Sequence, residues 1–121
     1  MHSSRSNADD RFTALTGDLL KIWSRAHGGE KAHARILEGQ ENLIAIVIDH
    51  AFTAFEIRLE EKITTRSLIR EYAERLIELI KPEMIQCVED TIGCIVAGCW
   101  IEPNVRDGNL LFLFKLDVEK P

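Results

Sequence analysis

The chain has 121 residues, of which 45% are hydrophobic and 29% are charged, and its net charge is −5. This size predicts one globular domain that buries about two-thirds of its unfolded surface without a metal or disulfide. The fifteen Lys and Arg residues are scattered, which excludes the basic stripe of a nucleic-acid-binding protein and the polybasic segment of a lipid-binding one.

The chain shows no signal for membrane insertion or export. Its longest apolar runs, 43–48 and 110–114, are far shorter than the about 20 residues of a spanning helix. The N-terminus lacks the apolar core of a signal peptide, and three cysteines are an odd number for a disulfide framework. We expect a cytoplasmic protein with a disordered tail or expression remnant at 1–8 and a single domain at 9–118.

The first predicted element is a helix. Ser6 or Asn7 can cap it, and one apolar stripe follows at three- and four-residue steps: Phe12, Leu15, Leu19, Ile22 and Ala26. Gly28 and Gly29 end the helix, because glycine accepts a left-handed backbone.

Two strands come next. In 31–37 small and apolar residues alternate with His33 and Arg35, as in a strand with one wet face. After a turn at 38–41, the run LIAIVI at 43–48 is apolar on both faces. This pattern is typical of a central strand that is covered on both sides.

The stretch 49–63 fits two structures. Phe55, Ile57 and Leu59 alternate with charged residues, as in a strand. The spacing of Phe52, Phe55 and Leu59 also fits one face of a helix. The pattern alone leaves both alternatives open.

A long helical pattern follows, which Thr65 or Ser67 can cap. Its predicted buried side holds Leu68, Ile69, Tyr72, Leu76, Ile77 and Ile80. Pro82 interrupts the pattern, which resumes with Met84, Ile85, Val88 and Ile92. Proline at this point predicts either a kink or a second helix that begins there.

Two final strands, 94–101 and 110–116, flank a loop at 102–108 of hairpin composition. The element order is therefore α-β-β-α-α-β-β. It predicts an α+β fold, with a four-stranded, mainly antiparallel sheet and helices packed on it.

All three cysteines lie within thirteen residues, at 87, 94 and 99. A structural zinc site typically contains a C-x₂₋₄-C pair and four ligands. Regular alternation would also put Cys94 and Cys99 on opposite faces of a strand. We expect the cysteines to pack as small apolar side chains, with no metal and no disulfide.

The polar residues best placed for contacts lie near the first two strands. Asp49 and His50 follow the apolar strand, where loops often hold functional groups, while His33 and Arg35 share the wet face and Lys31 precedes them. A carboxylate beside histidine can act as a general base, but neighbours on a strand point to opposite faces. We therefore expect partner or ligand contacts at these five residues, and neither catalytic residues nor a cofactor.

Several segments resemble a small bacterial family named for MpsC of the Na⁺-translocating membrane-potential-generating system. They are Gly29-x-Lys31, EGQENLIAIVID, Phe52-Thr53 with Glu56 and Leu59, Lys81-Pro82-Glu83, Val88-Glu-Asp-Thr-Ile-Gly93 and LLFLFKL, within about residues 10–118. The resemblance implies a short helix near 52–59. It also implies a soluble accessory protein linked to membrane ion or bicarbonate handling. It does not imply an enzyme, and we expect none.

These observations lead to two hypotheses. The first is a non-catalytic accessory protein that docks on a protein partner, with a membrane transport component as the candidate. It is expected to form a homodimer, because three or four helical segments leave a sheet face or edge for a second copy. Arg35 and the proline step at 81–82 are its expected docking points. The second is a small-molecule sensor or minor enzyme with a pocket near Asp49 and His50. A flat apolar surface favours the first, and a polar cavity at those residues favours the second.

Overall fold

The computed structural model describes residues 3–28, 31–40 and 42–117. Its seven elements follow the predicted order: α1 (Ser3–His27), β1 (His33–Gly39), β2 (Leu43–Asp49), α2 (Ala54–Glu61), α3 (Ile63–Ile92), β3 (Ile95–Asn104) and β4 (Asn109–Asp117). The predicted α+β class and element order are confirmed. Residues 1 and 2 of the predicted tail (1–8) and residue 118, the predicted end of the domain (9–118), lie outside the described residues.

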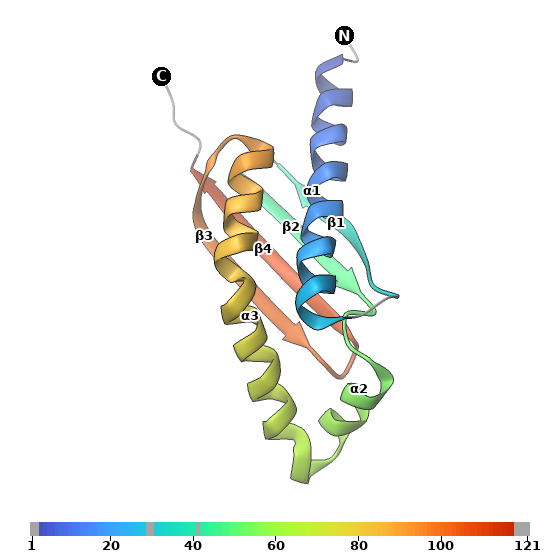
Figure 1. Cartoon of the computed structure of the whole chain (residues 1–121). Helices are drawn as coiled ribbons and strands as arrows, with labels where there is room; N and C mark the ends of the chain where they lie inside the picture. Colours follow the sequence, from blue (N-terminus) through green and yellow to red (C-terminus); the bar gives the residue numbers. More distant parts are fainter. Residues whose placement is uncertain (1–2, 29–30, 41, 118–121) are drawn as a thin grey trace.

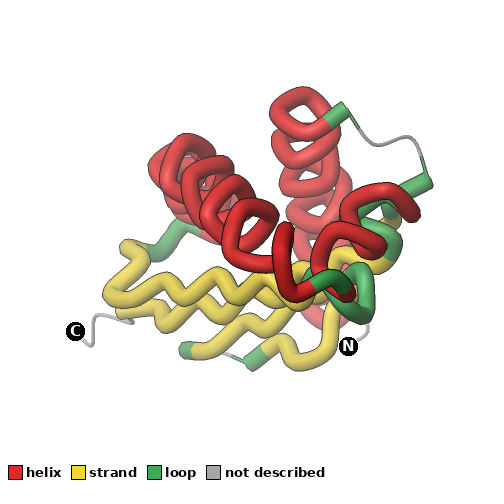
Figure 2. Tube along the Cα trace, turned by 90° about the horizontal axis from the view of Figure 1, so that it is seen from below, coloured by secondary structure: helices red, strands yellow, loops and turns green. Residues whose placement is uncertain are grey.

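The molecule has two layers, a sheet and the helices on one of its faces (Figures 1 and 2). The strands are ordered β1-β2-β4-β3, and each neighbouring pair is antiparallel. Helices α1 and α3 lie side by side on the sheet, and α2 packs on α3. The prediction that β2 is covered on both sides is wrong, because all the helices lie on the same face.

Helix α1 covers the sheet with the predicted stripe. Leu15, Leu19 and Ile22 are buried, and Trp23 joins them, whereas Ala26 is exposed. The helix begins at Ser3, before the predicted caps, and ends at His27. The next residue, Gly28, has a φ of 87° and donates its amide to the Ser24 carbonyl, as expected of the predicted stop. The indole of Trp23 donates to the carbonyl of Ala51 over 3.1 Å, which anchors α1 to the loop after β2.

The ambiguous stretch 49–63 is the short helix α2, as the family resemblance implies. Thr53 and Glu56 form a capping box: the Thr53 hydroxyl accepts from the Glu56 amide, and the Glu56 carboxylate accepts from the Thr53 amide. These bonds satisfy amides that a helix start leaves without partners. The capping box favours the helix over the strand.

Helix α3 runs from Ile63 to Ile92 and contains Pro82 within its length, so no second helix begins there. Its start precedes the predicted caps, and the hydroxyl of Thr65 instead donates to the Leu59 carbonyl. The predicted buried side is partly wrong, because Leu68 and Tyr72 are exposed. The buried residues are Ile69, Ala73, Leu76, Ile77, Ile80, Met84 and Val88.

The two edge strands each carry a β-bulge. The register shifts between Ile36 and Glu38 in β1, and between Val96 and Gly98 in β3. A bulge adds one residue to its strand and so reverses the facing of all later residues relative to a regular strand. Strand β3 also continues into the predicted loop and ends at Asn104.

Candidate functional site

The sheet face turned away from the helices, here called the outer face, is apolar at its centre. On β4, the buried Leu110, Phe112 and Phe114 point to the helices, so Leu111 and Leu113 point outwards. The paired residues Val47 and Ala45 of β2 and Trp100 of β3 share that side. Leu111 is 41% exposed and Trp100 55%, which leaves large apolar side chains in contact with solvent.

Trp100 lies flat on its own strand. A Cβ placed on Gly98 would come within 2.6 Å of the Trp100 ring, so the indole occupies the space that a side chain would take. Glycine is thus required there for the ring to cover the bulged part of β3. The result is a broad aromatic surface beside Leu113.

A polar cluster stands at one corner of the outer face. Arg35 Nε donates to Asp49 Oδ2 over 2.6 Å, and His33 Nε2 lies 3.6 Å from the same oxygen. The guanidinium lowers the pKa of Asp49 through this hydrogen bond, while burial opposes the shift. The structure thus brings His33, Arg35 and Asp49 together, as strand pairing of 33 with 49 requires.

His50 joins this cluster, which the sequence argument did not foresee. Its φ of 55° takes it out of the strand, and its ring lies 5.5 Å from that of His33. The expectation that His50 and Asp49, as neighbours on a strand, point to opposite faces therefore does not hold. Lys31, the fifth predicted contact residue, is exposed beside β1. The corner is rich in cationic or basic groups around one carboxylate.

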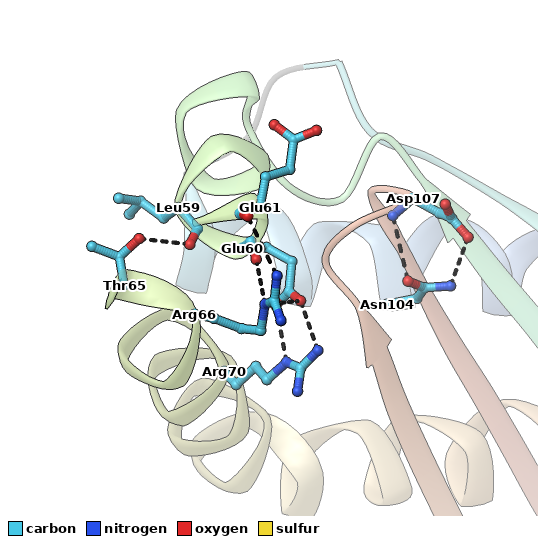
Figure 3. A network of polar contacts seen from close by, with 8 residues as sticks. All are labelled: Leu59, Glu60, Glu61, Thr65, Arg66, Arg70, Asn104 and Asp107. Carbon is cyan, nitrogen blue, oxygen red and sulfur yellow. Dashed lines mark hydrogen bonds and ion pairs between the residues drawn. The ribbon is translucent and has the colours of Figure 1, made fainter. Parts of the chain in front are cut away.

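A second polar network, not predicted from the sequence, joins α2 to α3 (Figure 3). The Glu60 side chain is 3% exposed and accepts two hydrogen bonds from Arg70, of 3.0 and 2.7 Å. Arg66 donates to the Glu60 carbonyl and lies 3.6 Å from its carboxylate. The Arg70 hydrogen bonds lower the pKa of Glu60, so the carboxylate stays charged although buried.

This network borders a groove of about 690 Å³ between α3 and the β3–β4 hairpin. Its charged lining is mostly acidic: Glu60, Glu74, Glu78 and Glu102, with Arg70 and Arg106. A groove of about 700 Å³ between α1 and α3 is lined by other residues, including the ion pair of Arg25 with Glu83. Neither groove includes the Asp49 corner.

His27, the last residue of α1, forms a buried pair with Glu56. Its Nε2 lies 2.8 Å from Glu56 Oε1, and the imidazole, 2% exposed, stacks on Trp23. Within the described part of the chain, Nδ1 has no hydrogen-bond partner. The same carboxylate caps α2, so the pair fastens the end of α1 to the start of α2.

The three cysteines are free thiols near the core. Cys94 and Cys99 both pack against the buried cluster, which contradicts the predicted opposite facing. The bulge in β3 between Val96 and Gly98 is the reason. Burial raises the pKa of Cys87 and Cys99. Among residues 3–28, 31–40 and 42–117, no group of His, Cys, Asp and Glu side chains is arranged to hold a metal ion.

The sequence model of one protein family, described as Na⁺-translocating membrane potential-generating system (MpsC), matches residues 24–118. The chain belongs to the MpsC family. The match covers the end of α1, all four strands and both later helices, including both polar networks described above. It confirms the resemblance drawn from the sequence.

No curated protein and no solved structure gives a significant match to this MpsC-family chain. None of its described helices combines the length and hydrophobicity needed to cross a bilayer. Family membership connects it to a membrane-associated sodium system.

Proposed function

We propose that this protein is a soluble, cytoplasmic accessory protein that performs no chemistry and works by docking on a protein partner in a membrane ion or bicarbonate transport system. Membership of the MpsC family supports the link to a sodium-translocating, potential-generating system. That link is one of family association, so the mode of action has to be argued from the surface of the molecule.

The observation that carries the proposal is the outer sheet face. It presents Leu37, Leu111 and Trp100 to solvent, over a sheet whose opposite face is fully used by the helices. Soluble monomers rarely expose contiguous apolar patches of this kind unless the patch binds something. The two large grooves lie away from the Asp49 corner, so neither supplies the pocket that a small-molecule sensor or enzyme with its site at Asp49 and His50 would need.

The corner residues Lys31, His33, Arg35, Asp49 and His50 form the polar rim of this face and make the partner contacts in the proposal. Interfaces typically have an apolar centre, a polar rim and arginine anchors. Arg35 is the strongest anchor of the five, because its guanidinium is held in place by Asp49 and still has free donors. The proposal also includes a homodimer that forms through the apolar centre, with the corner residues at the margin of that face in contact with the transport partner.

Deletion of the gene in the source cells tests this function. We expect a lower membrane potential and impaired growth that depends on sodium or bicarbonate supply. Complementation with Leu111→Lys should fail, whereas Leu79→Lys, a matched change at an exposed leucine of α3, should succeed. Normal potential and growth in the deletion strain, together with turnover of a metabolite by the purified protein, would favour an enzyme or sensor with its site near Asp49 and His50.

A further inference from the structure

In the part of the chain that the structure describes, no helix packs on the outer face. Val47 is 5% exposed and yet lies outside the cluster that packs against the helices, so its neighbours on the outer face bury it. Around it, the exposed apolar side chains come from three strands: Leu37 from β1, Leu111 from β4 and Trp100 from β3. A flat sheet surface of this kind fits a second flat sheet surface better than it fits a small ligand.

The sheet edges are poor alternatives for self-association. Both edge strands, β1 and β3, contain a bulge, and β3 also contains Pro103, which has no amide hydrogen to donate. Bulges and prolines on edge strands are devices that prevent strand-to-strand pairing. A second copy therefore meets the face of the sheet more readily than its edge.

The strand register places complementary groups across the outer face. One row runs Arg35, Val47, Leu111, Glu102 from β1 to β3. The next row runs from Leu37 and Glu38, through Ala45 and Leu113, to Trp100. Each row thus has an apolar centre, and the first has a cation at one end and a carboxylate at the other.

From this arrangement we infer that the outer face packs on the same face of a second copy, about a two-fold axis that runs parallel to the strands between β2 and β4. This axis places Arg35 opposite Glu102 of the second copy, and Val47 opposite Leu111 of the second copy. The symmetry repeats each contact, so two ion pairs flank one apolar centre. The inference deepens the self-association proposed above and identifies the partner of Arg35.

The other axis in the plane of the interface, perpendicular to the strands, is less favourable. It would set the first row against the second, so that Arg35 faces Leu37 and Glu38 of the second copy and Glu102 faces Trp100. Only the axis parallel to the strands pairs Arg35 with Glu102, and the charge swap described below tests this pairing.

The size of the face sets the expected affinity. Strands about 4.8 Å apart, with residues about 3.3 Å apart, give a face of roughly 20 by 25 Å, or on the order of 500 Å² per copy. A standard stable interface buries about 800 Å² per partner. We therefore expect a dissociation constant on the order of micromolar, which dilution can resolve.

The first experiment is sedimentation velocity of the full chain over about 1–100 µM, a range that spans such a constant. The wild-type protein should shift from monomer to dimer with concentration. Leu111→Lys puts a charge at the centre of the interface and should weaken association at least about tenfold. Leu79→Lys, on exposed α3, is the matched control and should leave it unchanged. Circular dichroism checks that both variants are folded.

The second experiment tests the axis with a charge swap. Arg35→Glu and Glu102→Arg should each weaken the dimer about three- to tenfold, and the double variant should recover most of the loss. Asp49 is present in every variant, so its effect within one copy cancels in the double-mutant cycle. Arg75→Glu, which breaks an exposed ion pair with Glu71 on α3, is the control and should have no effect.

Each result decides the inference. A monomer at all concentrations overturns it and leaves the face to a different protein. A dimer that resists Leu111→Lys overturns the interface, and single variants that weaken the dimer without recovery in the double variant overturn the axis. Recovery in the double variant supports it even where Leu111→Lys fails to fold. These readings do not involve membrane potential, so failure here is distinguishable from failure of the proposed function.

Discussion

The two faces of the sheet are built from the same strands but differ in what covers them. The helix side of β4 holds Leu110, Phe112 and Phe114, all fully buried, while Leu111, between them, is 41% exposed. Residues of nearly equal hydrophobicity thus have different environments one position apart. The apolar content of a strand therefore indicates that it lies in the centre of a sheet. It does not indicate whether the second face of the strand is covered by the same chain or by a second protein.

The largest expected effect is a difference in stability between substitutions on the two faces of β4. Phe112→Ala leaves a cavity under the helices and should lower the free energy of unfolding by about 3–5 kcal/mol. Leu111→Ala, on the outer face, should cost less than about 1 kcal/mol in the monomer. Urea denaturation at a protein concentration below dimer dissociation gives both values. Equal losses would mean that the outer face is packed within the monomer.

A smaller difference in stability is expected between substitutions of the two carboxylates that are hydrogen-bonded to arginine, Glu60 and Asp49. Glu60 of α2 pairs with Arg70 of α3, whereas Asp49 lies on the outer face, and hydrogen bonds from arginine lower the pKa of both carboxyl groups. A lowered pKa stabilises the fold above the ordinary carboxyl value, and this contribution is lost as the pH falls through the lowered pKa. Glu60→Gln should cost about 1–2 kcal/mol at pH 7.

The pH dependence tests the same pair. Glu60→Gln should flatten the loss of stability below the ordinary glutamate value of 4.5, and Asp49→Asn should flatten it less, because Asp49 is more exposed. Urea midpoints between about pH 3 and 7 measure this. A larger effect of Asp49→Asn would show that the outer-face corner contributes more to the fold than the Glu60 network.

The smallest effect concerns the two glycines on opposite faces. A Cβ at Gly98 would meet the Trp100 ring on the outer face, and one at Gly39 would meet the Phe12 ring of α1 at 2.8 Å. Because ring ends can move, Gly98→Ala should change stability by less than about 1 kcal/mol. It should shift Trp100 fluorescence to longer wavelength and weaken the dimer, while Gly39→Ala should do neither. An unchanged Trp100 signal in Gly98→Ala would contradict this.

Local patterns predicted most of the fold. The apolar stripe of α1 and the four strands follow from the spacing of apolar residues, and the end of α1 follows from the left-handed Gly28. The capping box of Thr53 and Glu56 is also visible in the sequence, as Thr-x-x-Glu, and would have favoured the helix over the strand at 54–61 without any family resemblance.

The remaining features depend on contacts between distant residues. Gly98, next to Ala97, is the one local signal for the bulge that turns Cys99 towards the core, because glycine within a strand often marks a bulge. The regular alternation assumed for the cysteines did not take it into account. His27 and Glu56 form a pair although they are 29 positions apart in the sequence. Glu60 and Arg70 come into contact because α3 packs along α2. His33, Arg35 and Asp49 were each predicted as contact residues. Their grouping into one cluster was not predicted, because it results from the pairing of β1 with β2.

The strand order β1-β2-β4-β3 makes the chain two copies of one unit, a helix followed by a hairpin, although the sequence has no repeat. A pseudo-two-fold axis perpendicular to the sheet, between β2 and β4, relates α1-β1-β2 to α3-β3-β4. The two strands of each hairpin are close in the sequence. Strands β2 and β4, which pair with each other, are separated in the sequence by a long segment that includes α3. Loop-closure entropy therefore makes the joining of two preformed halves the slow step of folding. A chain cut at Lys62 should reassemble from its two fragments.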